Sequence, residues 1–94
     1  MSVSDIRQRS QLRREEEIER LERSLTKLRE KHEELKQALF DTGKRLQGSP
    51  DSSLLVRETE HLKQTISDTV VDIRALDARL HRLKNRAKRS SRNG

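Results

Sequence analysis

The residue types that most often carry chemistry are sparse in this chain and lack catalytic spacing. Its three histidines, His32, His61 and His81, do not form a ligand pattern such as His-x-x-x-His, and there is no cysteine. The acidic run at 15–17 is typical of a solvated helix start, and the chain has no glycine-rich phosphate loop. The sequence therefore predicts a protein that is not an enzyme, with no catalytic residue, cofactor or metal site.

Positive charge near both ends of the chain is the strongest functional indication. Residues 1–14 contain four arginines and one aspartate, and residues 78–94 contain seven basic residues and no acidic one. Such clusters bind nucleic-acid phosphates, anionic surfaces or acidic proteins, and a solubilising tail is the plain alternative. No aromatic residue accompanies them for base stacking. The residues predicted to contact phosphate or an acidic partner are Arg82, Lys84, Arg86, Lys88, Arg89 and Arg92.

A heptad pattern runs through both halves of the chain and determines where these residues lie. In each half, mostly apolar residues recur at alternating spacings of three and four, which is typical of a helix packed along a partner helix. We call the two series together the seam. The first series is Ile18, Leu21, Leu25, Leu28, His32, Leu35, Leu39, Thr42 and Leu46, and the second is Leu55, Thr59, Leu62, Ile66, Thr69, Ile73, Leu76, Leu80 and Leu83, after which Ala87 keeps the spacing without a partner in the first series.

The break at residues 48–50 lets the second half fold back antiparallel to the first. In an antiparallel pair, two residues lie level with each other when their position numbers add to a fixed sum. With a sum of 101, every member of one series is level with a member of the other. Thr42 then faces Thr59, and His32 faces Thr69. An unpaired polar group against leucine costs roughly 1–3 kcal/mol, so this register is favoured. The predicted fold is an all-α, antiparallel two-helix coiled-coil hairpin.

Charges beside the seam mostly agree with this register. Exposed pairs contribute only a few tenths of a kcal/mol, so they select a register more than they stabilise it. The attractive contacts predicted are Glu17 with Arg86, Lys31 with Asp72, Arg45 with Glu58 and Glu15 with Lys84, whereas Glu22 faces Asp77 and Lys36 faces Lys63.

One flank of the hairpin is the predicted partner-binding surface. It carries four apolar residues outside the seam, which we call the apolar flank: Phe40, Val56, Val70 and Val71. A hairpin with one apolar stripe per helix is marginal alone, so we expect further helices to pack on it. A two-fold axis near Arg29 and Val70 would pair two hairpins in a four-helix dimer. The Glu22 and Asp77 pair of one hairpin would then face the Lys36 and Lys63 pair of the other. Scattered surface valines are the plain alternative.

Helix-capping signals divide the chain into five segments. We expect a basic segment at 1–14 that is helical but frayed, a helix at 15–47, a turn at 48–51, a second helix at 52–89 and a disordered basic tail at 90–94. Gly43 is expected to weaken the first helix, and Gly48 to end it. Ser49 is the expected N-cap of the second helix, with Pro50 at its first position and Asp51 and Ser52 as alternative caps.

Composition sets the remaining limits. Charged residues make up 40% of the 94 residues and hydrophobic ones 29%, which fits one domain with a narrow core; intrinsic disorder is the alternative that the seam argues against. No apolar run is long enough to span a membrane, and the N-terminus lacks the apolar core of a signal peptide. We expect an intracellular protein, cytoplasmic or nuclear, with secretion by a route without a signal peptide left open.

Three functions remain open at this point. The first is a coiled-coil interaction module, a scaffold or adaptor that forms a homo- or hetero-oligomer by helix packing. The second is binding of nucleic acid or an anionic surface through the basic termini, and the third is a helical partner or chaperone in a secretion or assembly complex. In outline the hairpin resembles coiled-coil finger domains that bind small GTPases and the helical hairpins of type VII secretion. The turn at 46–49 lacks the Trp-x-Gly of the latter family.

Overall fold

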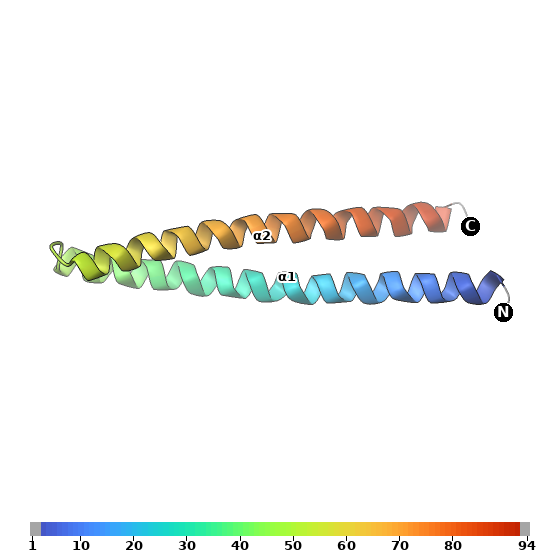
Figure 1. Cartoon of the computed structure of the whole chain (residues 1–94), viewed down its shortest axis with the longest axis horizontal. Coiled ribbons are helices and arrows are strands. Elements are labelled where there is room, and N and C mark those ends of the chain that lie inside the picture. Colours follow the sequence, from blue (N-terminus) through green and yellow to red (C-terminus); the bar gives the residue numbers. More distant parts are fainter. Residues whose placement is uncertain (1–2, 93–94) are drawn as a thin grey trace.

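The protein is a rod made of two long antiparallel helices. The computed structural model describes the backbone of residues 3–92 and the side chains of residues 7–86. Helix α1 spans Val3–Gly48 and helix α2 spans Ser53–Arg92, side by side and joined at one end (Figure 1). The molecule measures 71 × 20 × 14 Å. A 46-residue helix is about 69 Å long, so α1 alone sets the length of the rod. The predicted antiparallel helical hairpin is confirmed.

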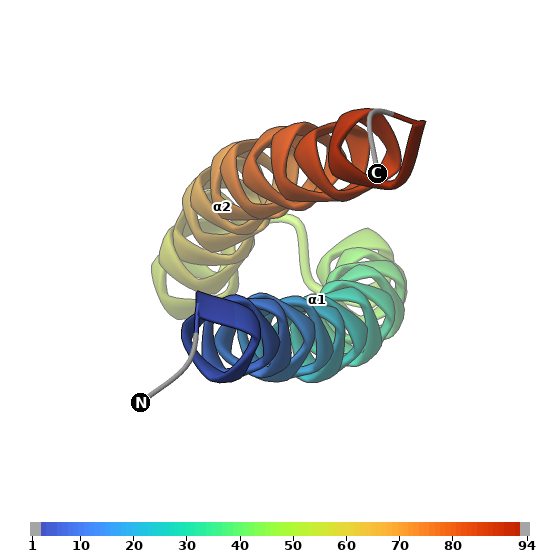
Figure 2. The same ribbon diagram turned by 90° about the vertical axis from the view of Figure 1, so that its right-hand side faces the viewer.

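The seam forms the contact between the two helices. All of its residues are buried or partly buried, whereas most residues between them are exposed. Viewed from the end that holds the termini, α1 and α2 wind around each other in a left-handed sense (Figure 2). A seven-residue repeat falls slightly short of two full turns of a straight helix, and left-handed winding keeps the two stripes in contact.

The best-packed part of the seam lies toward the termini. Its buried hydrophobic residues are Leu21, Leu25 and Leu80, and Ile18, Ile73, Leu76 and Leu83 pack against them. These seven residues belong to four successive levels of the predicted register. Three ion pairs between the helices agree with that register. In each, one residue lies five positions along its helix from the residue level with its partner. The pairs are Glu17 with Arg79, Glu22 with Lys84 and Arg29 with Asp77.

The threonines of the seam satisfy their hydroxyl groups within their own helix. Thr69, only 3% exposed, donates a hydrogen bond from Oγ1 to the carbonyl oxygen of Thr65 at 2.8 Å. Thr59 donates in the same way to the carbonyl oxygen of Leu55, also at 2.8 Å. Bonds of this kind are common for threonine in helices. These two hydroxyl groups therefore need no partner across the seam. The cost of an unpaired polar group does not explain why polar residues face each other at these levels.

The turn is built differently from the prediction. The Ser49 N–H donates to the carbonyl oxygens of Arg45 and Leu46, and the Ser52 N–H donates to the carbonyl oxygen of Ser49, all at 3.1 Å. Pro50 and Asp51 thus occupy the central positions of a β-turn, where the fixed φ of proline fits the first. The N-cap of α2 is Ser52, whose Oγ accepts the Leu55 N–H at 3.3 Å. The preferred assignment, Ser49 as cap with Pro50 opening the helix, was wrong, and the Ser52 alternative was right.

Both helices are longer and more regular than expected. Helix α1 passes through Gly43 without a break, and no described glycine has a positive φ, so Gly48 ends α1 without a left-handed residue. The segments expected to be frayed or disordered have helical backbone at 3–14 and 90–92, and residues 93–94 lie outside the described part. These segments contain no proline or glycine before residue 93, so nothing local stops the helix.

Candidate interaction surfaces

The apolar flank lies on the part of the rod nearer the turn. Phe40 of α1 is 59% exposed, and Val56 and Val71 of α2 are 44% and 62% exposed. Val70 is partly buried because it lies directly beside the seam. The Lys44 ammonium nitrogen is 4.5 Å from the centre of the Phe40 ring, one helical turn away, so a cation covers one face of the ring. The rest of the ring remains open to solvent.

The charges on this flank are neutralised within the hairpin. Glu22 contacts Lys84 at 2.9 Å, and Asp77 contacts Arg29 at 3.9 Å. The predicted contact between Glu22 and Asp77 is therefore wrong. Each carboxylate instead reaches the basic residue one heptad further along the other helix, where the charges attract. Coulomb attraction thus selects an oppositely charged residue five positions from level over a like-charged residue two positions from level.

The second predicted like-charge contact is also replaced. Lys36 pairs with Glu33 at 3.2 Å, and Lys63 pairs with Glu60 at 3.8 Å, each within its own helix. All four charges that were to bring two hairpins together thus have partners within one chain. Attraction between these charges therefore no longer supports the proposed four-helix dimer. The exposed apolar residues of the flank still do.

The opposite flank contains one of the predicted attractions in altered form. Arg79 donates a hydrogen bond from Nη2 to Oε1 of Glu17 at 2.7 Å, so Glu17 pairs with Arg79 rather than with Arg86. On the side of the apolar flank, Lys84 pairs with Glu22 rather than with Glu15.

Two other predicted attractions on that flank are absent. Among the residues whose side chains are described, Lys31 with Asp72 and Arg45 with Glu58 do not form ion pairs.

Both basic segments lie at the same end of the rod, opposite the turn (Figure 1). Arg82, Lys84 and Arg86 are exposed, as are residues 7–16 of α1. Because Glu17 and Glu22 already hold Arg79 and Lys84, positive charge dominates only beyond that level. We call the segments 7–14 and 85–92 the basic end. The side chains of Lys88, Arg89 and Arg92, also predicted to contact phosphate, lie outside the described residues.

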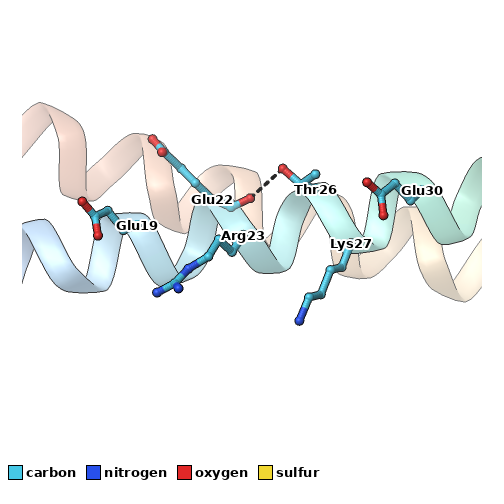
Figure 3. A pocket seen from close by; sticks show the side chains of 6 residues that line it. All are labelled: Glu19, Glu22, Arg23, Thr26, Lys27 and Glu30. Atoms are coloured by element: carbon cyan, nitrogen blue, oxygen red, sulfur yellow. Dashed lines mark hydrogen bonds between the residues drawn. The ribbon is translucent and has the colours of Figure 1, made fainter.

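A shallow depression on the outer face of α1 holds no candidate site. Its lining side chains all come from α1 and point along or away from the helix, with none contributed by α2 (Figure 3). The Thr26 hydroxyl donates to the carbonyl oxygen of Glu22 at 3.0 Å, so it is not aimed at a ligand. The lining residues are Glu19, Glu22, Arg23, Thr26, Lys27 and Glu30, three acids and two bases on an open face.

The three histidines do not form a metal-binding site with one another. His32 is partly buried in the seam, and His61 and His81 are exposed on α2. No three His, Cys, Asp or Glu residues in the described part of the chain are grouped so that they could hold a metal ion. Neither described helix has a stretch both long and apolar enough to cross a membrane.

Two exposed leucines were not among the predicted partner-binding residues. Leu54 is largely exposed at the start of α2, and Leu12 is exposed on α1. The signal for Leu54 was present in the run 54–56, in which only the middle residue, Leu55, belongs to the seam. Adjacent residues of a helix point about 100° apart, so neither neighbour of Leu55 can point into the seam.

Comparison with known proteins finds no relative of this chain. No family model, no curated protein and no solved structure matches the chain.

Proposed function

We propose that the chain is a non-enzymatic interaction module, a scaffold or adaptor that packs helices of a partner protein against the apolar flank. The observation that carries this proposal is the solvent exposure of Phe40, Val56 and Val71 beside a narrow core. Three large apolar side chains close to one flank are more than the occasional exposed leucine of an ordinary surface.

The total surface of the rod supports the same proposal. The chain exposes 7948 Å². A compact monomeric protein of 11.0 kDa exposes about 5,600 Å². The excess, about 2,300 Å², is larger than the roughly 800 Å² that each partner buries in a typical stable protein–protein interface. A helix pair that docks onto further helices removes part of this excess.

The electrostatics of the flank are compatible with docking. Burying an unpaired charge in an interface is costly, whereas paired charges at its rim cost little. Lys36 and Lys63 are paired with glutamates of their own helices, and Asp77 is paired with Arg29. A partner helix can therefore cover the valines without isolating any of these three charges.

Site-specific photo-crosslinking tests this proposal. A benzophenone amino acid is placed at Val71 and, as the matched control, at Asp72, which is exposed on the opposite flank of α2. We expect discrete products from position 71 in an extract of the producing cells and none from position 72. Purified chain alone shows in the same way whether a second copy is a partner.

Competition makes the test specific. Unlabelled wild-type chain should abolish the products, whereas the triple variant Phe40→Ser/Val56→Ser/Val71→Ser should leave them unchanged. The three changes are at exposed positions, so circular dichroism should show the same helix content. Equal product patterns at positions 71 and 72, or equal competition by the triple variant, would refute the proposal.

A further inference from the structure

The helices do not stop where their apolar contact stops. The outermost apolar level of the seam is formed by Ile18 and Leu83, but α1 begins fifteen residues before Ile18 and α2 continues nine residues beyond Leu83. These extensions are about 22 Å and about 13 Å long. Both leave the seam at the same end of the rod (Figures 1 and 2). Apolar packing between the helices does not explain them.

The composition of the extensions differs from that of the rod. Residues 7–14 contain four arginines and residues 85–92 contain three arginines and one lysine, with no acidic residue in either segment. Segment 7–14 is exposed throughout, and so are the described residues of the second segment, Asn85 and Arg86. Two exposed helices of like charge at the same end of the rod repel each other, and salt screens this repulsion only in part. A polyanion lying against both would turn this repulsion into attraction.

We infer that the basic end binds the phosphate backbone of double-stranded nucleic acid, independently of base sequence. This surface lies at the end of the rod away from the turn, so it goes beyond the proposed function and both surfaces can be occupied together. Seven of the eight basic residues are arginine, whose planar guanidinium matches the geometry of phosphate oxygens. An exposed helix also has the diameter that the major groove admits.

The same residues argue against the other polyanions. Neither segment contains an aromatic residue, so unpaired bases have no stacking platform. Leu12 is the one apolar residue larger than alanine in the two segments, so neither helix has the apolar face with which amphipathic helices enter a membrane interface.

Fluorescence anisotropy with the full chain and a labelled 20-base-pair DNA duplex tests the inference. Release of counterions from about four phosphates predicts that affinity falls by at least about 100-fold between 50 and 200 mM salt. The variant Arg7→Gln/Arg13→Gln/Arg86→Gln should bind at least about tenfold more weakly at 50 mM, with the salt slope reduced by about three. All three side chains are exposed, so helix content should not change.

The matched control removes the same charge from the rod. Arg23→Gln/Arg57→Gln/Arg74→Gln changes three exposed arginines outside the basic end and should keep the affinity within about threefold of wild type. Equal weakening by both triple variants would show that net charge alone drives binding. Duplex binding unaffected by the first triple variant would also overturn the inference.

Three further probes separate the polyanion classes at equal phosphate or carboxylate concentration. They are a single strand of the same length, vesicles with 30% anionic phospholipid, and polyglutamate. The inference requires the duplex to bind most tightly. Tighter binding of vesicles or polyglutamate, or no duplex binding at 50 mM salt, overturns it.

Discussion

The two halves of the seam are packed by different kinds of residue. In the terminal half, from Ile18 to Leu28 and from Ile73 to Leu83, every seam residue is aliphatic, and all three buried hydrophobic residues lie there. In the turn half, the buried seam residues are Thr42 and Thr69, and the leucines are only partly buried. The apolar flank lies beside this second half, with the exposed Phe40, Val56 and Val71.

This difference indicates how each half is held together. At the terminal half, no covalent connection keeps the helices together, and burial of leucine and isoleucine does. At the turn half, a connection of four residues between Gly48 and Ser53 keeps the helices close. A short loop lowers the entropy cost of closing that end, so the turn half tolerates threonine in its seam. Its incomplete core also leaves apolar surface for a partner.

The largest expected effect comes from truncating a leucine in the terminal half. Leu25 is 4% exposed, so Leu25→Ala should lower the free energy of unfolding by about 3 kcal/mol. Leu39→Ala in the turn half should cost about half as much, because Leu39 is only partly buried. Urea unfolding followed by circular dichroism at 222 nm measures both. Equal losses would break the comparison between the two halves.

The turn itself should contribute through one serine. Ser52→Ala removes the Oγ that accepts the Leu55 N–H and should cost about 1 kcal/mol. Ser49→Ala is the matched control and should be close to neutral, because Ser49 is bonded through its backbone groups. The two urea midpoints should therefore separate. A larger loss for Ser49→Ala would mean that α2 begins earlier than the structure shows.

A glycine in the turn half offers a stabilising change. Gly43 lies inside α1 with negative φ, and a Cβ built there meets no atom within 4 Å. Gly43→Ala should therefore raise the free energy of unfolding by about 1 kcal/mol, the difference in helix propensity. Thermal unfolding should show a higher midpoint. A lower midpoint would mean that the helices approach each other more closely at this level than the structure shows.

The smallest expected effect concerns the hydroxyl group of Thr69. Because this hydroxyl bonds to the carbonyl oxygen of Thr65 in its own helix, Thr69→Val should be neutral or stabilising by up to about 1 kcal/mol. A hydroxyl bonded across the seam to His32 would instead make the change destabilising by about 1–3 kcal/mol. Thr69→Ser, which keeps the hydroxyl and loses the methyl group, should destabilise. Chemical unfolding of the two variants distinguishes these cases.

The hairpin itself could be predicted from the sequence because the relevant signals are periodic. Alternating spacings of three and four residues set the buried stripe, and the one proline, two residues after Gly48, marked the reversal. The inner ends of the helices were predicted to within one residue, at 47 and 52. The outer ends were not, since no proline or glycine interrupts residues 3–14 or 90–92.

Individual contacts were less predictable, because each involves competing partners. Glu22 lies between Asp77 and Lys84, one heptad apart, and only the full set of neighbouring charges selects Lys84. Ser49 and Ser52 both suit an N-cap, and only the turn geometry decides for Ser52.

Exposure of the apolar flank follows in part from the heptad positions. A residue far from the seam, such as Val71, is exposed, whereas Val70 beside the seam is partly covered. The heptad positions do not say which partner covers the flank, because that depends on a second molecule.

The distance between spin labels at the two termini tests the central claim, that the two helices of one chain pack antiparallel with Ile18 level with Leu83. The chain has no cysteine, so Arg13→Cys/Arg86→Cys places two labels only, at exposed positions nearly level in this register. The hairpin predicts a distance below about 30 Å, since packed helix axes lie about 10 Å apart and the labels add the rest. The distance should persist when labelled chain is diluted tenfold with unlabelled chain. One continuous helix would instead separate the labels by about 110 Å, and that result, or a short distance lost on dilution, would contradict the fold described here.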